Sequence, residues 1–150
     1  MKVRHVNLKK GRLGELRTFL FWGWINIHTR VERDSSEWKA IVAHESKHWE
    51  QYKISYGLHP FLYKFSKSYR YQSELEAYAE EIVSLGKPLL VLPVARIIAD
   101  DYGLDVTPQQ AWRDLHAIIS RETKRIENNR KFEDLGIEGV TMDPEYYYKN

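Results

Sequence analysis

The chain has 150 residues, of which 43% are hydrophobic and 13% aromatic, enough apolar side chain for one folded domain with a sizeable core. Its 23 basic and 21 acidic residues leave a formal net charge of only +2, which offers no strong electrostatic argument for a nucleic-acid partner. The absence of cysteine excludes a disulfide framework, a thiol nucleophile and a cysteine-ligated metal. Its apolar runs, 19–25 and 89–95, are far shorter than the roughly 20 residues of a membrane-spanning helix. No secretory signal is recognised, so we expect a cytoplasmic or virion-associated protein.

The N-terminal region, residues 1–33, carries the pattern of β-strands. Segments 2–8 and 18–31 are rich in β-branched and aromatic residues, and the clearest alternation of apolar and polar side chains runs from Ile25 to Val31. Residues 11–14 include two glycines and are typical of a connection. We therefore expect two strands and a turn between them.

A long helix is predicted next, over residues 35–56. The segment 34–37 has the form of a capping box, with a short acceptor at its first position and Glu37 three residues later. Apolar residues then recur at steps of three and four, no proline interrupts them, and Gly57 follows as a natural end.

This helix contains the sequence H-E-S-K-H at positions 44–48. His44 and His48 are four residues apart, so on a helix they lie on one face and can reach a single ion. Glu45 then lies beside the open coordination position of a zinc ion. Apolar residues along the same side of the helix favour a buried metal site over two idle surface histidines.

A second helix is predicted over residues 70–85, closed by Gly86 and Pro88. Zinc needs a third protein ligand, and a downstream glutamate is a common solution. On a helical wheel Glu74 lies nearer the apolar stripe of this helix than Glu76 does. We therefore expect Glu74 as the third ligand and keep Glu76 as the alternative.

Two further helices are expected toward the C-terminus. Residues 88–102 form the first, which Pro93 should kink or restart. Residues 108–129 form the second, because Thr107 to Gln110 reads as a capping box with proline at the first helical position.

These elements predict an α+β fold, a mainly helical single domain over residues 1–150 with a small N-terminal antiparallel β-sheet before the H-E-x-x-H helix. The last segment, 130–150, is expected as a tail. Its run Tyr146-Tyr147-Tyr148 is unusually apolar for a free end, which suggests docking on the core or on a protein partner.

Residues 44–51 and 74–79 resemble the gluzincins, the thermolysin-like group of zinc peptidases. The likeness is greatest to small bacterial and phage peptidase-like proteins with the patterns H-E-x-x-H-x-x-Q and E-x-E-A-Y-A, and it covers roughly residues 35–85. In the longer relatives an aspartate follows the zinc glutamate by four residues, and this chain has Tyr78 there. That aspartate orients a ligand histidine, so here a carbonyl, a water or another acid must do so.

The resemblance implies a zinc metallopeptidase acting on an amide bond of a peptide, protein or peptidoglycan. One zinc ion would be held by His44, His48 and Glu74, and Glu45 would take a proton from the zinc-bound water. In gluzincin-like folds a strand before the motif helix borders the cleft and pairs with extended substrate. By this analogy Trp24–Val31 is the expected edge strand.

The oxyanion formed during such a reaction needs a second donor besides the metal. Tyr78 and His59 are the candidates to donate to this oxyanion or to orient a metal ligand, and Tyr71 and His116 are further ones. His59 precedes a proline and also fits an ordinary loop histidine.

Two alternatives remain open from the sequence. One is a non-catalytic metal-binding structural or interaction protein, such as a phage virion component, that retains the fold. The other is a DNA-associated protease of SprT type, which the basic N-terminus suggests, although such proteins use a third histidine that has no well-placed candidate here. The basic residues in question are Lys2, Arg4, Lys9, Lys10, Arg12 and Arg17.

Overall fold

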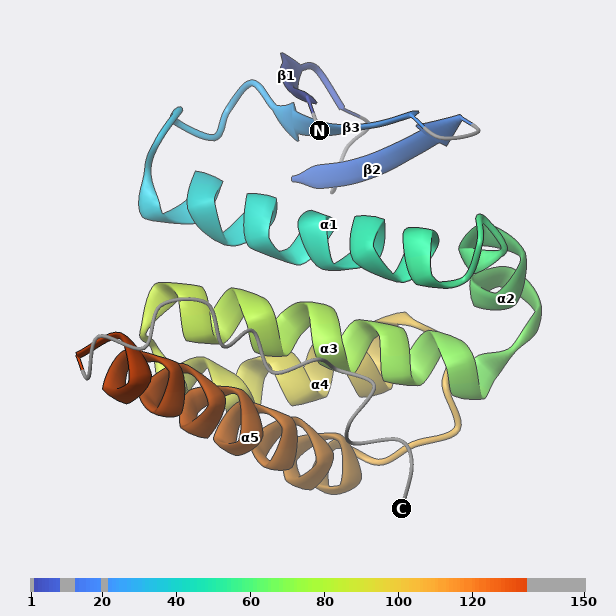
Figure 1. Ribbon diagram of the computed structural model, residues 1–150. Coiled ribbons are helices and arrows are strands. Elements are labelled where there is room, and N and C mark those ends of the chain that lie inside the picture. Colours follow the sequence, from blue (N-terminus) through green and yellow to red (C-terminus); the bar gives the residue numbers. More distant parts are fainter. Residues whose placement is uncertain (1, 9–12, 20–21, 135–150) are drawn as a thin grey trace. The chain divides into compact units, whose positions relative to one another are not determined.

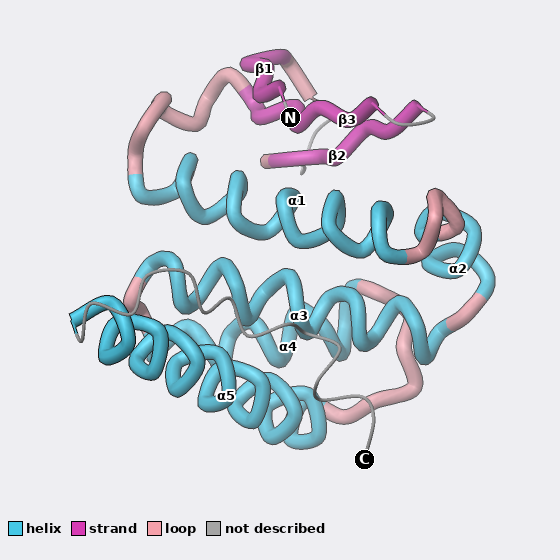
Figure 2. The backbone as a smooth tube through the Cα atoms, viewed as in Figure 1, coloured by secondary structure: helices cyan, strands magenta, loops and turns pink. Residues whose placement is uncertain are grey.

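A computed structural model describes residues 2–8, 13–19 and 22–134, without the side chains of Phe19 and residues 126–134. In chain order the elements are β1 (Lys2–Val6), β2 (Gly14–Phe19), β3 (Trp22–His28), α1 (Ser36–Ile54), α2 (His59–Phe65), α3 (Lys67–Leu85), the short 3-10 helix η1 (Pro88–Leu90), α4 (Val91–Asp101) and α5 (Pro108–Asp134) (Figures 1 and 2). The chain divides into two compact units, Met1–Ile119 and Ser120–Asn150. Everything below concerns the first unit unless stated.

The predicted small N-terminal sheet is confirmed, but it has three strands and is mixed. The strand order is β1-β3-β2, with β2 antiparallel and β1 parallel to β3. Residues 11–14 were expected as a connection, yet Gly14 already begins β2. Because this extra strand reverses the chain between β1 and β3, those two strands run in the same direction. β3 is therefore central, and the expectation that Trp24–Val31 forms the edge strand is wrong.

One face of the sheet packs on α1 (Figure 1). Ile25 and Ile27 are fully buried there and form a core cluster with Trp38, and Ile41 and Val42 of α1 pack against this cluster. The apolar side chains of the alternation predicted from Ile25 onward therefore face α1, the helix that contains His44 and His48.

Helix α1 begins one residue later than the capping box suggested. The backbone N–H of Trp38 donates to Ser35 Oγ at 3.1 Å, so Ser35 rather than Asp34 is the N-cap. Asp34 itself has a φ of +63°. At the other end the helix stops at Ile54, and Gly57 has the left-handed φ of +84° that ends the turn.

The short helix α2 lies where a loop was expected. Pro60 occupies its first turn, a position that needs no backbone donor. Helix α3 then starts at Lys67, three residues before the predicted start, with Ser66 accepting a hydrogen bond from the backbone N–H of Tyr69 at 3.2 Å. It ends as predicted at Gly86, which has a φ of +61°.

A second core lies between α3, α4 and the first part of α5, with Leu75, Ile82, Ile98 and Leu115 fully buried. Pro93 does not kink a helix, because α4 begins only at Val91 and Pro93 falls in its first turn. Helix α5 continues to Asp134, so part of the expected tail is helical, and Tyr146–Tyr148 lie outside the described residues. Among the helices described, none combines the length and apolar character needed to cross a bilayer.

Candidate metal centre

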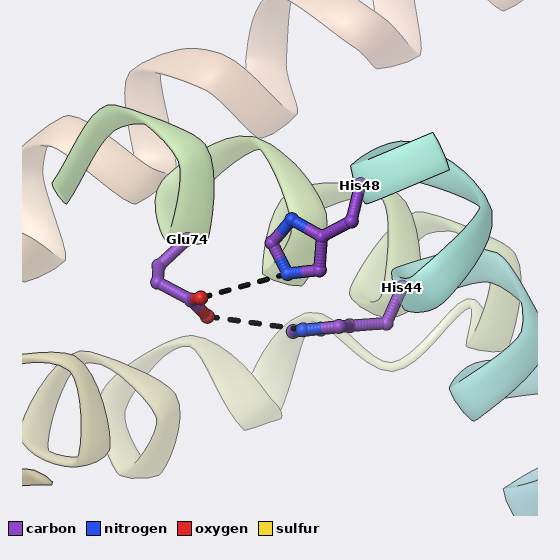
Figure 3. Close-up of side chains that lie close together, drawn as sticks. All are labelled: His44, His48 and Glu74. Carbon is purple, nitrogen blue, oxygen red and sulfur yellow. Dashed lines mark ion pairs between the residues drawn. The ribbon is translucent and has the colours of Figure 1, made fainter. Parts of the chain in front are cut away.

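The metal candidates come together where α1 and α3 pack side by side (Figure 1). His44 and His48 project from one face of α1, and Glu74 projects from α3 toward them (Figure 3). One ligand atom from each of the three lies within 4.8 Å of the other two. Glu76, the alternative, is not part of this group.

The spacing of these three groups fits a shared ion. Glu74 Oε2 lies 3.8 Å from His44 Nε2, and Glu74 Oε1 lies 3.5 Å from His48 Nε2. Both distances are too long for good hydrogen bonds. Ligand atoms around a tetrahedral zinc ion, with bonds of about 2.0–2.2 Å, lie about 3.3–3.6 Å apart. Glu74 is only 2% exposed, and among the described residues its Oε2 has no hydrogen-bond partner. A buried carboxylate oxygen is costly without a partner, so this group could hold a metal ion.

Hydrogen bonds on the far side of each ring orient the two histidines. His44 Nδ1 donates to Glu81 Oε2 at 3.1 Å, and His48 Nδ1 donates to Gln51 Oε1 at 2.9 Å. Each Nε2 is thereby left facing Glu74. Glu81 supplies the orienting carboxylate that the sequence required, one turn beyond Tyr78.

Gln51 is held by a buried network. Its Oε1 also accepts from Ser73 Oγ at 2.7 Å, and its Nε2 donates to the Ser73 carbonyl at 3.2 Å and to Glu76 Oε2 at 3.0 Å. Glu76 therefore supports the amide that orients His48. A fully hydrogen-bonded network of this kind fixes the imidazole in place.

Tyrosines surround the third member of the group. The Tyr63 hydroxyl donates to Glu74 Oε1 at 2.5 Å, so Oε2 is the carboxylate oxygen that lacks a hydrogen bond among the described residues. The ring of Tyr78 meets the ring of His44 edge-on, with centroids 4.5 Å apart, and its hydroxyl lies 3.0 Å from that of Tyr102. Burial raises the pKa of Tyr78 to about 12, so its hydroxyl keeps its proton at neutral pH.

The other oxyanion candidates differ in position. His59 is buried on α2, with its ring 5.4 Å from that of His48 and its Nδ1 2.9 Å from the Tyr69 hydroxyl. Burial, and then the charge of His48, lowers the pKa of His59 to about 4, so it is neutral at pH 7. Tyr71 instead donates to Asp114. His116 is exposed, with its ring tilted against that of Trp112 at a centroid distance of 5.5 Å, so neither Tyr71 nor His116 belongs to the group.

Glu45 lies between the metal group and β2. The backbone N–H of Leu16 hydrogen-bonds to its carboxylate. His28 N donates to Leu13 O at 2.8 Å across the β2–β3 pair, so backbone groups at Leu16 point away from β3 and toward α1. A Cβ at Gly14 would collide with Ile41 and approach Glu45 within 3.2 Å of its Oε1. Glycine at this position therefore lets the edge of the sheet approach Glu45 closely.

The electrostatics of the site favour a cation. Burial raises the pKa of Glu45 and the charge of Glu74 raises it further, while His44 and the Leu16 N–H act against them. Burial lowers the pKa of His44, but the hydrogen bond to Glu81 and the nearby carboxylates outweigh it, so the net shift is upward. Burial and His44 lower the pKa of His48. Three carboxylates close to two imidazoles form an environment that a divalent ion would neutralise.

Three of these groups were not expected from the sequence. Glu81 lies two turns after Glu74 on the same face of α3, so the helical wheel that favoured Glu74 could also have found it. Gln51 stands three residues after His48 on the ligand face of α1. Tyr63 had no comparable signal, because it lies on the short helix that was expected as a loop.

Comparisons with protein-family models, with curated proteins and with solved structures find no match to this chain. The likeness to gluzincins thus depends on the two sequence segments described above. The arrangement of His44, His48 and Glu74 is an independent observation.

Proposed function

We propose that this chain is a zinc-dependent metallopeptidase of gluzincin type, which hydrolyses an amide bond in a peptide, a protein or peptidoglycan. The observation that carries the proposal is the convergence of the Nε2 atoms of His44 and His48 on the buried carboxylate of Glu74, whose Oε2 accepts no hydrogen bond within the described part of the chain. Two imidazoles and one glutamate form a donor set used by catalytic zinc sites, which keep a fourth position for water or substrate.

When bound, a zinc ion polarises the substrate carbonyl and lowers the pKa of a coordinated water. Glu45 is adjacent in sequence to a ligand but outside the ligand group, so its carboxylate is free to move protons. It takes a proton from the attacking water and delivers it to the leaving amine. The Leu16 N–H holds the Glu45 carboxylate in position. Tyr78 and His59 are the proposed donors to the developing oxyanion.

We place the binding site for an extended substrate along the free edge of β2. The backbone groups of Gly14 and Thr18 and the carbonyl of Leu16 point away from β3 and are the groups offered to a substrate, because the Leu16 N–H already donates to Glu45. An extended peptide could add to this edge as a further strand. This places the substrate next to Glu45, which the central strand β3 cannot do.

The direct test is hydrolysis by the purified protein of a panel of unstructured proteins, peptides and peptidoglycan fragments. We expect cleavage of at least one substrate class, loss of cleavage after treatment with a chelator, and recovery on addition of one equivalent of zinc. Cleavage that survives complete metal removal would refute the proposal.

Replacement of Glu81 by alanine should weaken zinc binding by about 10- to 100-fold, because His44 loses the carboxylate that orients it. Glu80→Ala is the matched control, since it removes the neighbouring carboxylate on the same helix without touching His44. Competition against a chromogenic chelator measures both affinities. If the two variants bind zinc with equal affinity, Glu81 does not orient His44 for metal binding.

Burial of the centre supports a second candidate function. Glu74 is 2% and His48 9% exposed, which suits a metal that stabilises the packing of α1 on α3 without turnover. Such a non-catalytic protein would bind zinc and melt at a lower temperature after chelation, yet cleave nothing in the panel.

A further inference from the structure

The face of the sheet opposite α1 carries two tryptophans. Side chains alternate along a strand, and Ile25 and Ile27 of β3 point to the core. Trp22 and Trp24 therefore point the other way. Trp22 is 76% exposed. We call this side of the sheet the outer face.

Within the unit that ends at Ile119, α1 is the described helix that packs extensively on the sheet, and it covers the inner face. Gly23, between Trp22 and Trp24 in the strand, lies on the inner face, because a Cβ there would meet the ring of Trp49 on α1 at 2.5 Å. No described element of this unit covers Trp22.

Basic side chains flank the tryptophans on both neighbouring strands. The guanidinium of Arg4 lies 4.9 Å from the centroid of the Trp24 ring. Lys2 of β1 and Arg17 of β2 are the register partners of Trp24 on either side. Glu15 pairs with Arg17 at 2.7 Å and is the acidic member of this face.

The N-terminal part of the sequence is also rich in basic residues. The first 17 residues contain six Lys or Arg and a single Glu, although the whole chain has a net charge of only +2. Three of the six, Lys9, Lys10 and Arg12, lie outside the described residues. The small overall net charge, which offered no strong argument for a nucleic-acid partner, hides this local excess of basic residues.

We propose that the outer face binds single-stranded nucleic acid, with bases stacking on Trp22 and Trp24 and phosphates contacting Lys2, Arg4 and Arg17. Aromatic rings interleaved with cations on an open sheet are suited to unpaired bases and their backbone. A membrane surface is less suitable, because the outer-face positions described carry no aliphatic side chain as exposed as Trp22. The proposal does not depend on the metal centre or on peptidase activity.

The test is fluorescence anisotropy of a labelled single-stranded oligothymidylate and a matched oligouridylate, titrated with the full-length protein at low salt. We expect binding that weakens with salt at a log–log slope of about −2, from three phosphate contacts at about −0.7 each. Trp22→Ser should weaken binding about tenfold or more through lost stacking. Arg4→Ser should reduce the magnitude of the slope by about 0.7.

Two variants outside the outer face serve as controls. Trp112→Ser removes a tryptophan that is 42% exposed on α5, and Arg96→Ser removes an exposed cation on α4. Both should bind like the unmodified protein. The proposal is overturned if neither oligonucleotide binds, if Trp112→Ser weakens binding as much as Trp22→Ser, or if a duplex binds more tightly than the single strand. Binding to anionic phospholipid vesicles without binding to either oligonucleotide would also overturn it, in favour of a membrane partner.

Discussion

Glu74→Ala should reduce bound zinc from one ion per chain to background, whereas Glu76→Ala should retain the ion. Glu74 supplies the sole carboxylate of the three-residue group, and its buried Oε2 accepts no hydrogen bond from the residues that the structure describes. Loss of one of three protein ligands leaves two imidazoles, too few for a stable structural or catalytic zinc site. Glu76 reaches His48 only through Gln51. Elemental analysis after dialysis against a weak chelator measures both contents.

A third variant separates metal loss from damage to the fold. Glu74→Gln keeps an oxygen that can accept from the Tyr63 hydroxyl and preserves the volume of a side chain that is almost fully buried. It should fold, with a circular dichroism spectrum like that of the unmodified protein, and still fail to bind zinc. If Glu76→Ala loses the ion and Glu74→Gln keeps it, the assignment of the third ligand is wrong.

Glu45→Gln should keep the full zinc content and lower the rate of hydrolysis by at least about 10²- to 10⁴-fold, the usual contribution of a general base. The amide oxygen can still accept from the Leu16 N–H, so the position of the side chain should be preserved. An amide cannot take up the proton of the attacking water, and this loss should appear in kcat with little change in KM.

Glu37→Gln is the control for this experiment, because it makes the same substitution at an exposed position of the same helix. It should leave both zinc content and hydrolysis unchanged. Retention of hydrolysis in Glu45→Gln would show that another group is the base. Absence of hydrolysis in the unmodified protein, with zinc present, would instead favour the non-catalytic centre.

The long helices could be predicted because their signals are local. Periodic apolar residues and capping side chains specify α1, α3 and α5 to within a few residues at most ends, and the helical wheel separated Glu74 from Glu76. The first part of strand β2 was not predicted, because glycine at position 14 is typical of a turn. In the structure Gly14 instead lets the backbone of β2 approach Glu45 closely. Helix α2 was missed because its seven residues, with Pro60 in the first turn, carry too little periodicity to reveal a helix.

The sequence by itself determined that His44 and His48 share one face of a helix, because a separation of four residues is one turn whatever surrounds it. Only the tertiary structure decided which side chains of α3 lie beside these two histidines. The local sequence does not specify how α1 packs on α3, because a loop and helix α2 separate them. The packing of these two helices brings Glu74 to both Nε2 atoms and Glu81 to His44. Strand order was likewise decided only by the tertiary structure. It follows from long-range pairing, which the alternation of side chains within one strand cannot specify. In this sheet β3 is the central strand and β2 is the edge strand beside Glu45.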